Sequence, residues 1–76
     1  MKLIAHRGNI DGANPKTENT LEQIDKCIEE GYDVEIDLWY NITTQTFWLG
    51  HDHPKEIITF YELAKRSQYL WVHCKD

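Results

Sequence analysis

The sequence lacks the features that would mark a membrane protein or an exported protein. No stretch approaches the roughly 20 consecutive apolar residues of a membrane-spanning helix. The opening residues, MKLIAHRG, contain one Lys and only a short apolar run, so they do not supply the apolar core of a signal peptide. We therefore expect a cytoplasmic protein with no integral membrane segment.

Positive charge is also scarce. The chain has 8 Lys and Arg residues against 13 Asp and Glu residues, which gives a formal net charge of −5. Proteins that bind nucleic acid or anionic membranes need a cationic surface to displace counterions. We therefore expect no nucleic-acid partner, and a phosphate ligand would have to be held by a few local cations. A bound divalent cation is compatible with this acidic balance.

The chain has only two cysteines, Cys27 and Cys74. They do not form a CxxC pair, and no histidines accompany them at the spacing of a zinc finger. The pattern predicts two buried, apolar side chains in a reducing compartment. A Walker-type glycine-rich phosphate loop is also missing, and Ser67 has no companion that would make it a nucleophile.

The 76 residues suffice for one small domain. The apolar periodicity predicts three strands, over 2–6, 33–39 and 69–75, and a loop over 8–18. The capping residues predict a helix capped by Asn19 and ending at Glu30, and a short helix from Thr59 to about Arg66. Residues 41–50 are predicted to be an extended segment that could be a hairpin arm. This alternation predicts a parallel sheet with helical crossovers. Three parallel strands make an incomplete sheet, so the pattern is typical of the beginning of a larger α/β fold.

Polar residues gather at the carboxyl ends of the three predicted parallel strands. They are His6 and Arg7, then Glu35 and Asp37, then His73 and Lys75. In barrel and doubly wound α/β folds this end of the strands carries the active site. We therefore expect a functional site there.

Glu35 and Asp37 would share one face of their strand with Trp39, because residues two apart point to the same side. Two buried carboxylates repel one another and need a compensating cation or a shared proton. Mg²⁺ and Ca²⁺ take oxygen ligands of this kind. The alternative is that this face is exposed to solvent and the acids are ordinary surface residues.

His6 and His51 are candidates for acid–base catalysis, since histidine titrates near neutral pH. Arg7 offers a planar fork for phosphate oxygens, and Lys75 could add a second positive charge. Each has a structural alternative: histidines that only support the fold, an ion-paired surface arginine and a solvated lysine. Asp52 either orients His51 or caps the turn that follows.

The tryptophans Trp39, Trp48 and Trp71 are predicted to lie in the core or at its rim rather than to stack on a substrate. His53 precedes Pro54 and is predicted to face solvent in a turn.

Four strings, IAHRG, TENT, VEIDLW and LGHD, occur in this order and resemble the motifs of the glycerophosphodiester phosphodiesterase family, within the superfamily of phosphatidylinositol-phospholipase-C-like phosphodiesterases. The resemblance implies a (β/α)8 barrel, of which residues 1–76 would be the first β-α-β-α-β portion. It implies that His6 and His51 are the general acid and base and that Arg7 holds phosphate. It also implies that Glu35 and Asp37 bind Mg²⁺ or Ca²⁺.

The resemblance places Glu18 near the site and departs from the family in the last strand. There the family has Glu-x-Lys, whereas this chain has His73 and Lys75 around Cys74, so His73 would be a neutral nitrogen ligand or none. A complete barrel needs about 250 residues. We therefore expect further barrel segments or self-association.

The expected activity is metal-dependent hydrolysis of glycerophosphodiesters, or of related small phosphodiesters in lipid metabolism. The alternative is a truncated, catalytically incompetent barrel segment that only binds a cation or assembles.

Overall fold

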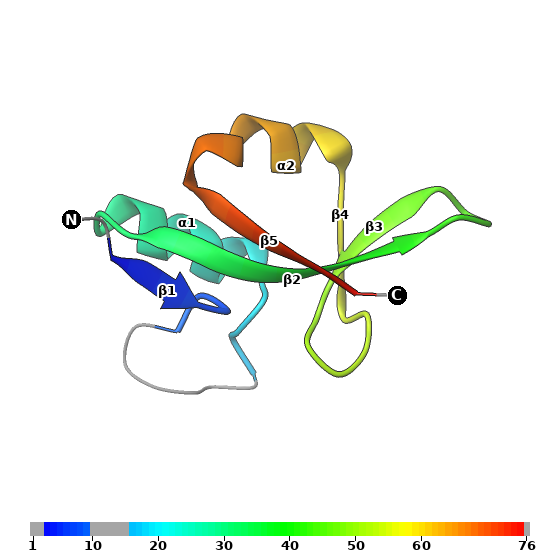
Figure 1. Cartoon of the computed structure of the whole chain (residues 1–76), viewed down its shortest axis with the longest axis horizontal. Helices are drawn as coiled ribbons and strands as arrows, with labels where there is room; N and C mark the ends of the chain where they lie inside the picture. The colour runs from blue at the N-terminus through cyan, green and yellow to red at the C-terminus, as the bar shows by residue number, and fades with distance from the viewer. Residues whose placement is uncertain (1–2, 10–15, 76) are drawn as a thin grey trace.

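The computed structural model describes residues 3–9 and 16–75. These residues form a small α/β domain with one mixed sheet of five strands and two α-helices (Figure 1). The elements are β1 (Ile4–His6), α1 (Leu21–Glu29), β2 (Asp33–Asn41), β3 (Thr46–Leu49), β4 (Glu56–Ile58), α2 (Phe60–Lys65), a 3-10 turn η1 (Ser67–Tyr69) and β5 (Leu70–Lys75). Residue 2 of the predicted first strand and residues 10–15 of the predicted loop lie outside the described residues.

Strand β2 is the centre of the sheet, and the predicted parallel pairing is confirmed for three strands. Residues 33–35 of β2 pair in parallel with 4–6 of β1, and residues 34–39 pair in parallel with 70–75 of β5. The carboxyl ends of β1, β2 and β5 therefore meet at one edge of the sheet.

The prediction of an entirely parallel sheet is wrong. Strand β2 continues to Asn41, turns back through residues 42–45 and pairs antiparallel with β3, and β3 pairs antiparallel with β4, a strand that the sequence did not predict. So short a connection can join only antiparallel strands. The Asn41 side chain favours the turn because its Oδ1 accepts hydrogen bonds from the backbone N–H groups of Thr43 and Thr44.

The cap of α1 is Thr20, not Asn19 as predicted. The Thr20 hydroxyl accepts a hydrogen bond from the Gln23 N–H at 3.2 Å, whereas the Asn19 side chain points toward the sheet. The helix ends at Glu29, one residue before the predicted end, and Gly31 follows with a φ of 92° that suits glycine.

The cap of α2 agrees with the prediction. The Thr59 hydroxyl accepts a hydrogen bond from the Glu62 N–H at 3.1 Å, and the helix ends at Lys65.

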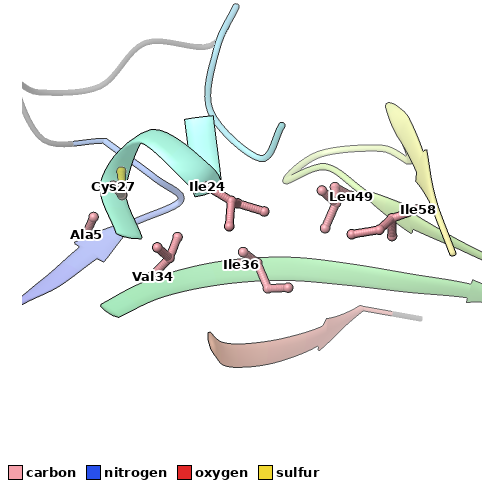
Figure 2. Packing of buried hydrophobic residues seen from close by; sticks show 7 residues of the cluster. All are labelled: Ala5, Ile24, Cys27, Val34, Ile36, Leu49 and Ile58. Carbon is pink, nitrogen blue, oxygen red and sulfur yellow. The ribbon is translucent and has the colours of Figure 1, made fainter. Parts of the chain in front are cut away.

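The core lies between the sheet and the helices. Val34 and Ile36 on β2 are fully buried against Ile24 and Cys27 of α1 (Figure 2). Leu63 of α2 packs against the same cluster. Both helices therefore cover the face of β2 that carries its even-numbered residues. The other face, which carries Glu35, Asp37 and Trp39, has no helix over it in the described part of the chain.

The two cysteines differ. Cys27 is buried as predicted, but Cys74 is exposed, so that part of the prediction is wrong. Cys74 lies on β5, at the margin of the sheet, and its neighbour Val72 is also 47% exposed because the cover of the helices ends there.

No helix in the described ranges is both long enough and apolar enough to cross a membrane.

Candidate functional site

Residues from four parts of the chain meet at the carboxyl ends of β1, β2 and β5. In the strand register His6 lies beside Glu35, and Asp37 lies beside His73. The turn after β3 adds His51 to this group through a contact with Asp37. We call the residues around this carboxylate the Asp37 cluster: Arg7, Glu18, Asn19, Asp37, His51 and His73.

Asp37 is the centre of the cluster and is only 1% exposed. Its Oδ2 accepts hydrogen bonds from Asn19 Nδ2 at 3.0 Å and lies 3.2 Å from His51 Nδ1. Its Oδ1 lies 3.2 Å from His73 Nδ1. The alternative that Asp37 is an ordinary surface acid is therefore wrong. Glu35 is different, since its side chain keeps 35% of its exposure.

The pKa of Asp37 is lowered from its usual value. Burial acts in the opposite direction and is the largest single influence, because it disfavours the charged carboxylate. The hydrogen bonds from Asn19 and His51, together with the electrostatic attraction of His51 and Lys75, outweigh it. Asp37 is consequently an anion at neutral pH, held by the groups around it.

Asn19 has a role in the site that sequence reasoning missed. Besides its bond to the carboxylate, its Oδ1 accepts a hydrogen bond from the Asp37 backbone N–H at 2.9 Å, so one side chain holds both groups of Asp37. Its φ of 53° is left-handed, a conformation that Asn tolerates better than most residues. The sequence did hold a signal for this role: the next residue, Thr20, is itself a good helix cap, so Asn19 was not needed as the cap.

Arg7 lies at the turn after β1 and contacts three members of the cluster. Its guanidinium lies 3.3 Å from Glu18 Oε2 through Nη1 and 3.6 Å from Asp37 Oδ2 through Nε. Its Nη2 lies 2.9 Å from His51 Nε2. The left-handed φ of 55° at Arg7 is uncommon for such a residue, and strain of this kind is typical of functional sites.

The contacts of His51 determine which of its nitrogens carries the proton. Arginine is always protonated and can only donate, so His51 Nε2 must accept from Arg7. The proton of the neutral ring then lies on Nδ1, which donates to Asp37. Histidine bases oriented by a carboxylate have this arrangement, although the Nε2 lone pair of His51 is occupied by Arg7. Asp37 therefore orients His51 through Nδ1, while Asp52 Oδ1 lies 3.7 Å from Nε2.

The turn that carries His51 is tied to the rest of the site. A Cβ at Gly50 would collide with the carbonyl oxygen of His53, so this position requires glycine. The Gly50 carbonyl accepts a hydrogen bond from Trp39 Nε1 at 2.6 Å. Lys55 Nζ donates to the Glu18 carbonyl at 2.6 Å, which links the turn to the segment before α1.

A second histidine–carboxylate pair lies beside the Asp37 cluster. His6 Nε2 is 2.8 Å from Glu35 Oε1, and a carboxylate at this distance requires that Nε2 carry the proton. Lys75, which lies opposite Trp39 in the register, is close enough for its charge to act on Asp37. His53 is exposed, as predicted.

The described residues, as placed, do not fit the implied divalent ion. Both oxygens of Asp37 lie against nitrogen donors, and Glu35 is paired with His6. Within residues 3–9 and 16–75, no three Asp, Glu, His or Cys side chains come together as a metal site. A hard cation needs six or more oxygen ligands, so further ligands and some rearrangement would be required.

Comparisons of the chain with models of protein families, with curated proteins and with solved structures find no match. The fold and the cluster define a small α/β domain with a polar site at the carboxyl ends of parallel strands. The function of this site is therefore inferred from its own geometry.

Proposed function

We propose that this domain carries the phosphate-binding and acid–base half of a phosphodiester hydrolase, as its resemblance to the glycerophosphodiester phosphodiesterase family implies. The observation that carries the proposal is the buried Asp37 carboxylate, around which Arg7, His51 and His73 converge. This arrangement combines a guanidinium with an oriented neutral base. The guanidinium can offset the negative charge of a phosphodiester, and the base can take the proton of the attacking hydroxyl.

Arg7 and Lys75 would bind the non-bridging oxygens of the phosphodiester. Arg7 keeps 25% of its side-chain exposure, so it is held by Glu18 and Asp37 and still reaches solvent. The planar fork of arginine matches two phosphate oxygens. The exposed ring of His73 would form the rim of the same site.

His51 and His6 would divide the proton transfers. His51 Nε2 accepts the proton of the attacking hydroxyl after it exchanges its contact with Arg7 for the substrate. In its doubly protonated form, in which Nε2–H faces Glu35, His6 would donate its other proton from Nδ1 to the leaving oxygen. If a hydroxyl of the substrate attacks first, a cyclic phosphate is the intermediate.

We further propose that the three parallel strands are the first part of a (β/α)8 barrel. Two features support this: β1, β2 and β5 are parallel neighbours, and α1 and α2 cover the same face. In such barrels the helices lie outside and the site lies at the carboxyl ends of the strands. The polar face of β2 would then point into the barrel.

Glu35 and Asp37 could hold the implied divalent cation, Mg²⁺ or Ca²⁺, only after Glu35 leaves His6 and Asp37 leaves its nitrogen partners, with substrate and water as further ligands. We expect that Ca²⁺ or Mg²⁺ raises the melting temperature of the wild-type chain and has no effect on Glu35→Gln. Equal shifts in both proteins would show that the ion binds elsewhere.

The proposed activity is tested by incubating the chain with a glycerophosphodiester and measuring the phosphomonoester product by ³¹P NMR. We expect His51→Ala and His6→Ala to lose product formation by at least a hundredfold, which is within the usual contribution of general acid–base catalysis. His53→Ala is the matched control, because this histidine is exposed outside the cluster. Activity near wild type in both site variants would refute the assigned roles.

A second candidate function is an assembly module without activity. Strands β1 and β5 each pair only with β2 among the described strands, and Ile4 and Trp71 on them are about half exposed. Open edges and exposed apolar residues favour association. Light scattering on the purified chain distinguishes the two: an active monomer excludes the module, and an inactive oligomer favours it.

A further inference from the structure

A pocket of about 510 Å³ lies in the hairpin next to the Asp37 cluster. Its lining includes Trp39, Ile42, Trp48 and Pro54. Pockets that hold small molecules usually have volumes of roughly 300–1,000 Å³. Sequence reasoning placed these tryptophans in the core or at its rim, and both are only half-buried.

The pocket continues the polar face of β2. Trp39 follows Asp37 by two residues, so both side chains lie on the same face, about 7 Å apart along the strand. Trp48 lies directly opposite Trp39 on β3 and shares this face. The Trp39 indole also bonds to the Gly50 carbonyl, immediately before His51. The Trp39 side of the pocket therefore adjoins the turn that carries His51.

The two indoles offer apolar ring faces and no free N–H group. Trp39 Nε1 donates to the Gly50 carbonyl, and Trp48 Nε1 donates to the Thr46 hydroxyl at 2.8 Å. Tyr40, whose ring contacts that of Phe47, also lines the pocket, and Asn41 and Thr44 add polar groups to it. The two indole faces make the pocket suited to a flat aromatic group.

We infer that this pocket binds an aromatic ester group of the phosphodiester, so that the preferred substrates carry an aryl group on one ester oxygen. The inference rests on the proposed function, since the phosphate must be held by Arg7 and Lys75. Flat rings gain from stacking on indole faces, and the negative charge of the ester is met by the neighbouring cations.

The test compares methyl phenyl phosphate with dimethyl phosphate by calorimetric titration of the full chain. Both ligands are singly charged diesters and differ only in the ring. We expect the phenyl ester to bind roughly tenfold more tightly, the factor that corresponds to one stacking contact of about 1.4 kcal/mol. Trp48→Leu should abolish this preference and leave dimethyl phosphate binding unchanged. Trp71→Leu, the same substitution on β5 outside the pocket, should retain it.

The outcomes separate the inference from the proposed function. Equal affinities for the two esters, or a preference that survives Trp48→Leu, would overturn the aromatic subsite and leave the phosphate site standing. Binding of neither ester would overturn both. The wild-type comparison needs no variant, so it decides the question even if Trp48→Leu fails to fold.

Discussion

The two faces of β2 are stabilised by different means, although they alternate along the same strand. Val34 and Ile36 are fully buried under α1 and are held by apolar packing. Asp37, between Ile36 and Leu38, is almost as deeply buried, but it is held by hydrogen bonds and ionic contacts from the Asp37 cluster. One face supplies stability to the domain, and the other carries its candidate chemistry.

Burial has opposite effects on the free energy of folding at the two faces. Full burial of a Val or Ile side chain contributes about 1.5–3 kcal/mol. Burial of a carboxylate costs free energy unless every charge and hydrogen-bonding group has a partner. The apolar face therefore supplies the stability of the domain. The polar face needs its own hydrogen bonds and ionic contacts to offset the cost of burying a carboxylate. Single substitutions on each face can test this division.

The largest effect is expected on the apolar face. Ile36→Ala should lower the free energy of unfolding by about 2–5 kcal/mol, through lost burial and the cavity left behind. A core of this size supplies only about 3–5 kcal/mol, so the variant should be largely unfolded. Urea unfolding followed by far-UV circular dichroism measures the change. Ile57→Ala is the control, because Ile57 is 56% exposed, and an equal loss there would contradict the assigned core.

The next effect concerns the contact between Asn19 and Asp37. Asn19→Ala leaves the buried backbone N–H of Asp37 without its Asn19 partner and removes one hydrogen bond from the carboxylate, which His51 and His73 still contact. This loss should cost about 1–3 kcal/mol. Thr20→Ala removes the helix cap and should cost about 1 kcal/mol. Thermal unfolding of the two variants compares them. A smaller loss for Asn19→Ala than for Thr20→Ala would show that Asn19 is not the structural partner of Asp37.

The third effect is the pH dependence of stability that Asp37 contributes. Its folded-state pKa lies below that of the unfolded chain, so its contribution is complete above about pH 4 and is lost as the pH falls toward the folded value. Each unit of lowering is worth about 1.4 kcal/mol. Urea midpoints between pH 7 and pH 3 should fall less steeply in Asp37→Asn than in wild type.

A residual slope is expected in that variant because the pKa of Asp25 is also lowered, first of all by its hydrogen bond with Arg66. Asp25→Asn should remove the part of the pH dependence that Asp25 contributes, independently of Asp37. Asp25 and Arg66 join α1 to the end of α2, away from the cluster. Unchanged slopes in Asp37→Asn would contradict the charged state assigned to Asp37.

The smallest effect is chemical and leaves the fold intact. Cys74 is exposed, whereas Cys27 is buried and its thiol pKa is raised, chiefly by burial. The thiolate is the reactive form, so one thiol per chain should react quickly with a disulfide reagent and the second only after unfolding. The absorbance of the released thiolate measures both phases. A single fast phase of two thiols would mean that α1 does not cover β2 as described.

The sequence predicted the fold where local signals were sufficient. The cap at Thr59 and the turn at Gly31 are short-range patterns, and each agrees with the structure. Burial along β2 does not alternate, since Asp33 and Asp37 are buried as well as Val34 and Ile36. The sequence predicted an extended segment over 41–50 that could be a hairpin arm, and β3 is such an arm. Strand β4 was missed, because it pairs with β3 and therefore depends on the hairpin turn at residues 42–45. Strand β4 has three residues, too few to show a period.

The site was predictable in its location but not in its contacts. His6, Arg7, Asp37 and His73 meet at one edge because parallel strands align their carboxyl ends. Asn19 was misassigned since Asn and Thr are both good caps, and only the packing of α1 decides which one turns toward the sheet. The sequence could not show that Arg7 contacts His51, 44 positions away.

If the Asp37 cluster binds a phosphate ester, the ligand changes the environment of the imidazole rings around it. In a ¹H–¹⁵N titration with dimethyl phosphate, we expect the ring signals of His6, His51 and His73 to shift together. His53, which is exposed outside the cluster, should remain unchanged. If none of the three signals shifts, or if His53 shifts equally, the proposed site is contradicted.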